Sequence, residues 1–245
     1  MNSTKISVVT ACFNSSATIG KTLDSLLNQT CKNFEHIIID GDSSDGTLDI
    51  IQSYIATAEH KVLLVSEPDN GLYDAMNKGI KLAAGQFVSI LSSDDWYELD
   101  AIENVLAHTH LDIDIIYGYL RVIKNDKEFM VRRSNLEFID SLDGQIQHPA
   151  CFVSKSLYIE NGLYDTTYKV CADQDLFLRM LRSGARINAV DRIITNFVIG
   201  GTSYTVDSFK EVVRYKLKFG LINRKKAFVS IIKYEISKIA KRIFF

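Results

Sequence analysis

The N-terminal part of the chain alternates four times between a short apolar or β-branched run and a run with helically spaced apolar residues. The four expected strands lie at 6–11, 34–39, 62–65 and 87–91. Strands that alternate with helices in this way form a parallel sheet with helices on both faces. The alternation therefore predicts an α/β fold with a mostly parallel sheet.

Each expected strand runs directly into a polar loop. The loops carry Phe13-Asn14, Asp40 to Asp42, Asp69-Asn70 and Asp94-Asp95. Because the carboxyl ends of parallel strands meet at one edge of a sheet, where open α/β sheets bind ligands, these loops predict a polar cleft. The sequence contains no dinucleotide-binding G-x-G-x-x-G after the first strand and no P-loop, so a nucleotide would be held in another way.

The fourth strand ends in two serines and two adjacent carboxylates, Asp94 and Asp95. Adjacent carboxylates repel each other unless positive charge lies beside them. A divalent cation with oxygen ligands and a diphosphate would relieve that repulsion. Alternatively, the Ser-Asp-Asp run caps a helix that starts near Leu99. Both interpretations fit these residues.

The second half of the chain is less regular. Its expected elements are strands at 114–119, 150–153 and 187–198, a hairpin around 124–127, and helices at 156–161 and 172–181. Asp173 falls in the first turn of the last helix, where its carboxylate faces the positive end of the helix dipole. A simple helix cap is again the alternative.

Charge is distributed unevenly over the 245 residues, whose net charge is −2. After residue 209 the chain carries 11 Lys and Arg but only two acidic residues. An acidic body with a basic tail argues against a general nucleic-acid binder and favours contact with an anionic membrane surface. The four cysteines show no C-x-x-C spacing, the chain has no signal-like start, and no apolar run approaches about 20 residues. These features predict a cytoplasmic protein.

Residues 206–245 are expected to form a helical tail that follows a domain over residues 1–205. Its apolar residues recur at helical spacing, its basic residues line the other side, and two aromatic residues end it. In order, these are Phe228, Ile232, Ile236, Ile239 and Ile243, then Lys225, Lys226, Lys233, Lys238, Lys241 and Arg242, then Phe244 and Phe245. Such a helix is typical of peripheral attachment to the inner face of the cell membrane. Packing on the body or in a homodimer is the alternative.

Four segments together resemble the family 2 glycosyltransferases of the GT-A fold. They are Phe13-Asn14, the turn at 40–47, the Asp94-Asp95 pair and the run at 173–179. The resemblance covers about residues 5–205 and implies a nucleotide-sugar-binding half over 1–98 and an acceptor half over 99–205. The run at 67–79 is similar to the corresponding run in the subgroup of this family that serves bacterial exopolysaccharide and O-antigen (lipopolysaccharide) biosynthesis.

The resemblance implies an inverting, metal-dependent hexosyltransferase. Asp95 would bind Mn²⁺ or Mg²⁺, with Asp94 as a further ligand nearer the ribose and donor sugar, and Asp173 would be the catalytic base. Apart from the resemblance, Lys78 could contact a phosphate, Trp96 could wall the sugar site and His148 could lie on the acceptor side. The alternatives are a solvated lysine, a tryptophan packed in the core and a packed or surface histidine. The full set of substrate-binding positions is Ala11, Phe13, Asn14, Asp40, Asp42, Asp69, Asn77, Lys78, Asp94, Trp96 and His148.

The sequence departs from the family pattern at two positions. Gly41 stands where the family often has a second carboxylate that helps to read the base, and Ala172 stands where it usually has a glutamate. The implied reaction moves a sugar from a nucleotide sugar, with a UDP-sugar expected, to a saccharide or polyprenyl-linked saccharide. The alternatives are a sugar nucleotidyltransferase and a non-catalytic sugar-nucleotide-binding subunit.

Overall fold

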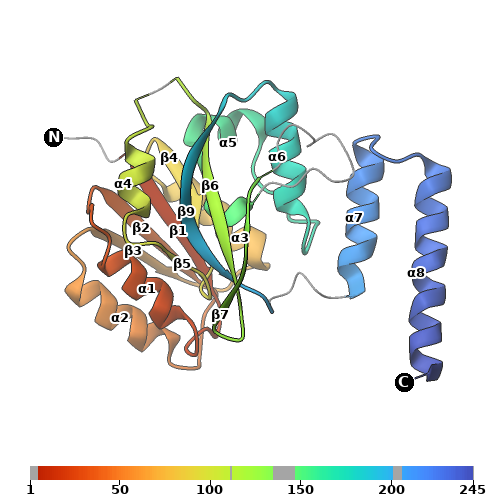
Figure 1. The fold of residues 1–245 in the computed structure, drawn as a ribbon. Coiled ribbons are helices and arrows are strands. Elements are labelled where there is room, and N and C mark those ends of the chain that lie inside the picture. Colours follow the sequence, from red (N-terminus) through yellow and green to blue (C-terminus); the bar gives the residue numbers. More distant parts are fainter. Residues whose placement is uncertain (1–4, 111, 135–146, 201–205, 245) are drawn as a thin grey trace.

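The protein folds around one sheet of nine described strands, flanked by helices (Figure 1). The computed structural model describes residues 5–110, 112–134, 147–200 and 206–244, and in the last range it describes the side chains of residues 209–236. The strand order is β3-β2-β1-β4-β8-β6-β9-β5, and β7 pairs with β6 outside this path. The predicted α/β class is confirmed.

The first four strands form the parallel part of the sheet. They are β1 (Ile6–Cys12), β2 (Phe34–Asp40), β3 (Lys61–Ser66) and β4 (Phe87–Ile90). The register aligns Cys12 of β1 with Asp40 of β2, and Asp40 with Ser66 of β3. The three strands therefore end at one level, and their loops share one edge as expected.

Helices cover both faces of this parallel part. Leu23 and Leu26 of α1 (Ile19–Leu27) belong to one buried hydrophobic cluster, which also contains residues of α2 (Thr47–Thr57). Met76 of α3 (Leu72–Leu82) belongs to the cluster on the other face. Helix α3 approaches β1 so closely that a Cβ atom at Gly79 would collide with the side chain of Val9, so this crossing requires glycine.

The second half extends the sheet with antiparallel and parallel pairs. Strand β8 (Cys151–Ser154) runs antiparallel to both β4 and β6 (Ile115–Lys124). Strand β9 (Ile187–Val198) runs parallel to β6, which also pairs with β7 (Lys127–Arg132). The strand expected at 114–119 and the first arm of the hairpin expected around 124–127 form the single strand β6. The short β5 (Trp96–Tyr97) was not predicted, because a two-residue strand held only by β9 leaves no periodic pattern.

Short helices connect these strands, and two longer helices follow them. The short ones are α4 (Ala101–Leu106), the 3-10 helix η2 (His148–Ala150), α5 (Lys155–Asn161) and α6 (Ala172–Arg182). The predicted helical tail consists of α7 (Val206–Lys218) and α8 (Arg224–Phe244), which lie side by side (Figure 1). An ion pair of 2.9 Å between Lys210 and Glu235 joins the two helices. Among the described helices, none is both long and apolar enough to span a bilayer.

Candidate active site

The loops after β1 and β2 are bonded to each other at the carboxyl edge of the sheet. The backbone N–H of Asn14 donates to Ser43 Oγ at 2.8 Å, and the N–H of Ser44 donates to Asn14 Oδ1 at 2.9 Å. Asn14 has a φ of 48°, a left-handed conformation that asparagine tolerates better than most residues. Asn14 therefore shapes this edge through its backbone and its side chain together.

Asp40 is fully buried and holds the β2 loop from within. Its carboxylate accepts hydrogen bonds from the backbone N–H and hydroxyl of Ser43 and, at 2.7 Å, from the hydroxyl of Ser66. Burial acts to raise the pKa of Asp40, but these hydrogen bonds hold it below its usual value. This placement differs from the predicted contact with substrate, because the carboxylate points into the protein.

The rim of the edge is formed by side chains from three loops. Phe13 is 61% exposed, and Asp42 is exposed with a φ of 68°. A Cβ atom at Gly41 would lie 2.7 Å from Asp69 Oδ2 and 3.3 Å from Phe13 Cδ2. Asp69 therefore occupies the space into which a side chain at position 41 would extend.

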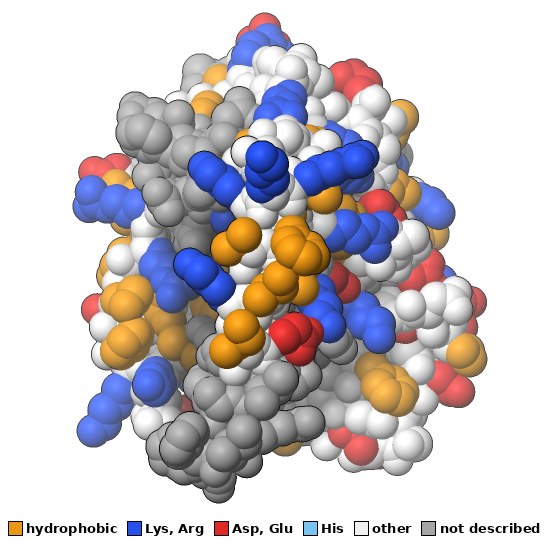
Figure 2. Space-filling model, turned by 90° about the vertical axis from the view of Figure 1, so that its right-hand side faces the viewer, with side chains coloured by type: hydrophobic (Ala, Val, Ile, Leu, Met, Phe, Trp, Pro, Cys, Tyr) orange, Lys and Arg blue, Asp and Glu red, His pale blue; other side chains and the backbone are white. Residues whose placement is uncertain are grey.

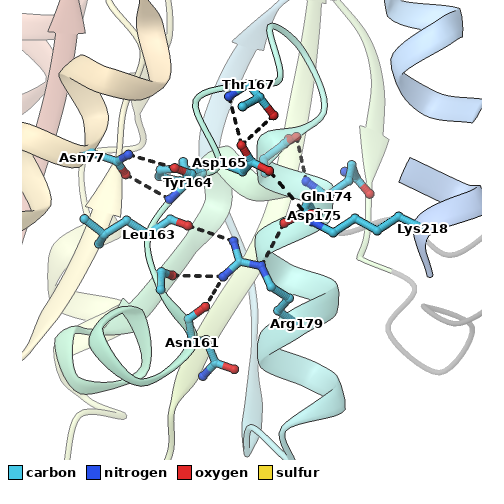
Figure 3. A network of polar contacts seen from close by, with 12 residues as sticks. Asn77, Asn161, Leu163, Tyr164, Asp165, Thr167, Gln174, Asp175, Arg179 and Lys218 are labelled. Atoms are coloured by element: carbon cyan, nitrogen blue, oxygen red, sulfur yellow. Dashed lines mark hydrogen bonds and ion pairs between the residues drawn. The ribbon is translucent and has the colours of Figure 1, made fainter. Parts of the chain in front are cut away.

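Three predicted substrate-binding residues instead have structural contacts. Ala11 is buried in the core beneath the rim. Asn77 donates to the backbone carbonyl of Tyr164 at 2.9 Å and accepts from its N–H at 3.0 Å (Figure 3). Lys78 forms an ion pair with Glu67 at 2.8 Å and donates to the carbonyl of Pro68. Ala11 lies in β1, and Asn77 and Lys78 lie in α3. Nothing in the sequence indicated that the polar atoms of Asn77 and Lys78 bond within the protein.

The two carboxylates of the turn after β4 differ in burial. Asp95 is fully buried: its Oδ1 accepts from the N–H of Val198 at 2.9 Å, and its backbone carbonyl accepts from the hydroxyl of Thr22. Asp94 is only half-buried. The hydroxyl of Ser93 donates to Ser15 Oγ at 3.0 Å, which joins this turn to the β1 loop. Asp94 therefore lies at the edge shared by the loops described above.

Both carboxylates of this turn lie where positive charge would stabilise them. Burial raises the pKa of Asp94, and burial together with the charge of Asp94 raises the pKa of Asp95 well above its usual value. Asp95 Oδ2 is buried without a hydrogen-bond partner in the described part of the protein. An unpaired oxygen beside a second carboxylate is the arrangement that a nearby cation would relieve.

The donor set fits a divalent ion that also binds a diphosphate. Within the described ranges, no three or more His, Cys, Asp or Glu side chains gather closely enough to hold a metal by themselves. Mg²⁺ and similar ions commonly take only one or two carboxylates, with phosphate oxygens and water completing the shell. The accessible carboxylate is that of Asp94, whereas the predicted ligand Asp95 faces the interior because Val198 and Thr22 hold its turn. The roles of Asp95 and Asp94 as metal ligands both stay predictions.

Asp173 lies near the same edge, from the other half of the protein. Strand β8 begins at Cys151, whose carbonyl accepts from the hydroxyl of Ser89 near the end of β4. The charge of Asp173 adds to burial in raising the pKa values of both Cys151 and Tyr73, so Asp173 is close to β8 and to the start of α3. Asp173 is itself half-buried in the first turn of α6.

The electrostatic setting of Asp173 suits proton transfer. Burial raises the pKa of its carboxyl to about 6, although the hydrogen bond from the Gln174 backbone favours the charged form. The N–H of Gln174 donates to Asp173 Oδ1 at 2.8 Å. A pKa near the working pH is what an efficient general base needs. The surroundings of Asp173 thus suit proton transfer as well as helix capping.

His148 and Trp96 are both half-buried, and each has a partner within the protein. His148 Nε2 lies 2.7 Å from the Tyr164 hydroxyl, and burial lowers its pKa to about 4, so the imidazole is neutral at pH 7. The Trp96 ring lies under Lys21, whose Nζ is 3.3 Å from the ring centroid. These contacts neither establish nor remove the predicted roles at the sugar and acceptor sides.

A buried ionic network that the sequence did not predict fixes helix α6 (Figure 3). Asp175 is fully buried and bonds Arg179 Nε at 2.8 Å and Lys218 Nζ at 2.6 Å. The guanidinium group also donates to backbone carbonyls of the segment after α5, at residues 161–163. The i,i+4 spacing of Asp175 and Arg179 could have indicated their pairing. No sequence signal connects Lys218 with either residue.

Comparison with known proteins agrees with this arrangement. The family model "Glycosyl transferase family 2" matches residues 7–180, and the chain belongs to this family. A PGL/p-HBAD biosynthesis glycosyltransferase of Mycobacterium bovis is 30% identical over 212 residues, which cover 82% of this chain and 79% of the relative. The fold is therefore the GT-A fold of a glycosyltransferase, as the sequence resemblance implied.

Two solved structures share the fold at low sequence identity. The fragment 1–349 of S. aureus TarS in complex with UDP-GlcNAc is 21% identical, with a TM-score of 0.71, and the match covers 94% of this chain and 71% of that one. The mannosyltransferase PcManGT from Pyrobaculum calidifontis, in complex with GDP-Man and Mn²⁺, is 18% identical, with a TM-score of 0.67. That match covers 94% of this chain and 68% of the other.

Proposed function

We propose that this glycosyltransferase is inverting and metal-dependent, and that it acts on a saccharide or lipid-linked saccharide during bacterial polysaccharide assembly. The observation that supports this best is the placement of two half-buried carboxylates, Asp94 after β4 and Asp173 beside the start of β8, the strand that pairs with β4. The first donor class to test is a UDP-sugar. The UDP-GlcNAc complex of TarS supports this choice.

In this proposal Asp173 is the general base. Its carboxylate accepts the proton from an acceptor hydroxyl while the hydroxyl oxygen attacks the anomeric carbon of the donor sugar. The nucleoside diphosphate leaves on the opposite side, so the anomeric configuration inverts. A positioned base typically contributes about 10²- to 10⁴-fold to such a reaction. Because the pKa of Asp173 is about 6, the base is mostly deprotonated at pH 7.

Asp94 is proposed to bind the donor's diphosphate end through Mn²⁺ or Mg²⁺. When bound, the ion supplies positive charge for the leaving diphosphate. Asp95 is proposed to support Asp94 from beneath, since its Oδ1 fixes the turn to β9 through Val198. Phe13, Asp42 and Asp69 are proposed to line the nucleotide side of the cleft, because they form the rim above Gly41.

A thermal-shift screen of nucleotide sugars tests the donor and the metal together. We expect a UDP-sugar with Mn²⁺ to raise the melting temperature, because ligand at about 100 times its Kd stabilises the folded state by about 2.7 kcal/mol. UDP-GlcNAc, UDP-glucose and GDP-mannose would be compared with and without Mn²⁺. Product analysis then separates the alternatives: release of a nucleoside diphosphate supports transfer, whereas release of pyrophosphate would support a nucleotidyltransferase. Donor binding with neither product would indicate a non-catalytic subunit.

The exposed face of α8 supports a second part of the proposal, peripheral attachment to an anionic membrane. Helix α8 packs on α7 through the buried Ala227 and a stacked pair of rings, Phe209 and Tyr234. The helix also exposes apolar side chains next to exposed lysines, and Figure 2 shows hydrophobic and basic side chains gathered on this side of the molecule. The apolar residues are Phe228, Val229, Ile232 and Ile236, and the lysines are Lys225, Lys226 and Lys233. The remaining tail residues predicted to join this face, from position 237 onward, lie outside the described side chains.

This face is suited to the interface between lipid head groups and acyl chains. Apolar side chains enter such an interface while lysines stay among anionic phosphates. Phe228 and Ile236 are 66% and 60% exposed, so packing on the described body does not account for these two side chains. Membrane attachment would bring the cleft to a lipid-linked acceptor, and a homodimer remains the alternative. The division into a domain at 1–205 and a tail at 206–245 also stays a prediction.

Reversing three charges should release the protein from vesicles. We expect the variant with Lys225→Glu, Lys226→Glu and Lys233→Glu to bind phosphatidylglycerol vesicles far more weakly, because each basic residue contributes about 1 kcal/mol, or about fivefold. Co-sedimentation measures this binding. Phe228→Asp should also weaken it, whereas Ile159→Asp is the matched control, since Ile159 is 69% exposed on α5. Equal binding by wild type and the triple variant would reject the proposal, and a change from dimer to monomer without loss of vesicle binding would favour the dimer.

A further inference from the structure

Glu211 of helix α7 holds the segment that leads into helix α6. Its Oε1 accepts the backbone N–H of Lys169 at 2.7 Å, and its Oε2 accepts the N–H of Val170 at 2.7 Å and of Cys171 at 3.3 Å. One carboxylate thus binds three consecutive amides. Hydrogen bonds to a charged acceptor are stronger than neutral ones, so this contact fixes the local backbone firmly. The segment ends two residues before Asp173.

Helix α7 also contacts the residues that follow Asp173. Lys218, two turns after Glu211, bonds the buried carboxylate of Asp175 at 2.6 Å (Figure 3). Tyr215 lies between them in sequence and is buried. The charges of Asp173 and Asp175 add to burial in raising the pKa of Tyr215 to about 12, so this tyrosine is near both carboxylates. Helix α7 therefore holds the chain on both sides of Asp173.

A third contact comes from the nucleotide-binding half. The Tyr73 hydroxyl donates to the carbonyl of Val170 at 2.8 Å, while the N–H of Val170 donates to Glu211. The same peptide segment is thus held from one side by α3 and from the other by α7. Since the family model ends at residue 180, the α7 contact lies outside the matched region. The sequence of the matched region alone gives no indication of it.

We propose that Glu211 is a positioning residue for the reaction: by binding the amides of residues 169–171, it sets the direction in which the Asp173 carboxylate faces the acceptor. This inference rests on the proposed role of Asp173 as the base. Without the carboxylate, three amides lose their acceptor, and the segment before α6 can shift. A displacement of about 1 Å at a reacting group can lower the rate about 100-fold.

The test combines kinetics with amide hydrogen exchange in the full-length protein. We expect Glu211→Ala to lower kcat about 10- to 100-fold, with the donor KM changed by less than about twofold. Nucleoside diphosphate release from the UDP-sugar found in the thermal-shift screen is the assay. Exchange at the amides of residues 169–171 should become faster in the same variant. Glu211→Gln keeps one acceptor oxygen and should fall between wild type and Glu211→Ala in both measurements.

Glu235→Ala is the matched control, because Glu235 lies on the same helical hairpin and pairs with Lys210 rather than with the segment before α6. We expect this variant to keep the wild-type kcat and the wild-type exchange at residues 169–171. If Glu211→Ala does not fold, Glu211→Gln carries the comparison alone.

The possible failures can be told apart. Unchanged kcat, or unchanged exchange at residues 169–171, in both Glu211 variants would overturn the inference and leave the role of Asp173 intact. An equal fall in kcat for Glu235→Ala would also overturn it, because the effect would then belong to the hairpin in general. Wild-type turnover by Asp173→Asn would instead overturn the proposed base.

Discussion

Replacing Asp173 with asparagine is expected to lower kcat about 10²- to 10⁴-fold while leaving donor binding nearly unchanged. The amide has almost the same shape as the carboxylate and can still accept the N–H of Gln174, so α6 should keep its start. It cannot accept a proton from the acceptor hydroxyl at neutral pH. Steady-state kinetics of nucleoside diphosphate release, with donor affinity measured by calorimetry, separates these two effects.

The pH dependence of the wild type provides an independent check on Asp173. Because burial raises the pKa of the carboxyl to about 6, the base is protonated and inactive below that pH and becomes active as the pH rises through it. We therefore expect kcat to rise between about pH 5 and 7 and then to level off. The residual activity of Asp173→Asn should lack this rise. A rise of the same size in the variant would assign the ionisation to another group.

The second large effect is expected at Asp94. Asp94→Asn should weaken Mn²⁺-dependent binding of UDP by at least about 10- to 100-fold. Removing a residue that only hydrogen-bonds to a metal ligand commonly costs this much affinity. The reason is that Asp94 is the accessible carboxylate of the turn, whereas Asp95 faces the interior. Calorimetric titration of UDP with and without Mn²⁺ measures the effect without any acceptor.

Asp95→Asn is the informative comparison for that experiment. An asparagine can still accept the N–H of Val198, and it removes a buried charge that Asp94 destabilises. We expect a smaller loss of Mn²⁺ dependence than in Asp94→Asn, together with a change in melting temperature. The opposite result, in which Asp95→Asn abolishes the Mn²⁺ dependence and Asp94→Asn keeps it, would instead identify Asp95 as the main metal ligand, as the sequence resemblance implied.

The fold could be predicted from sequence because its signal is local and repeated. Each round of the first half pairs a β-branched run such as 34–39 with a helix such as α2, and the register then places Cys12, Asp40 and Ser66 at one level. The two-residue strand β5 could not be predicted, since its partner β9 lies about a hundred residues away in sequence.

The site was harder to predict, because its polar residues look alike in sequence but differ in orientation. Nothing local distinguishes Asp94, which is half-buried, from Asp95, which is fully buried; the difference depends on Val198 in β9. In the same way, Asn77 bonds to Tyr164 rather than to the cleft. Glu211 has no motif at all, and only the packing of α7 against the start of α6 gives it a role.

The central proposal is that Asp94 and Asp173 face one bound donor from different sides. A crystal structure of the wild-type protein with UDP and Mn²⁺, in which the anomalous signal locates the metal, tests this most directly. We expect the manganese peak within coordination distance of Asp94 and of the diphosphate oxygens, with the Asp173 carboxylate turned toward the open space beyond the β-phosphate. A metal held by other residues, or an Asp173 carboxylate turned away from that space, would contradict the proposal.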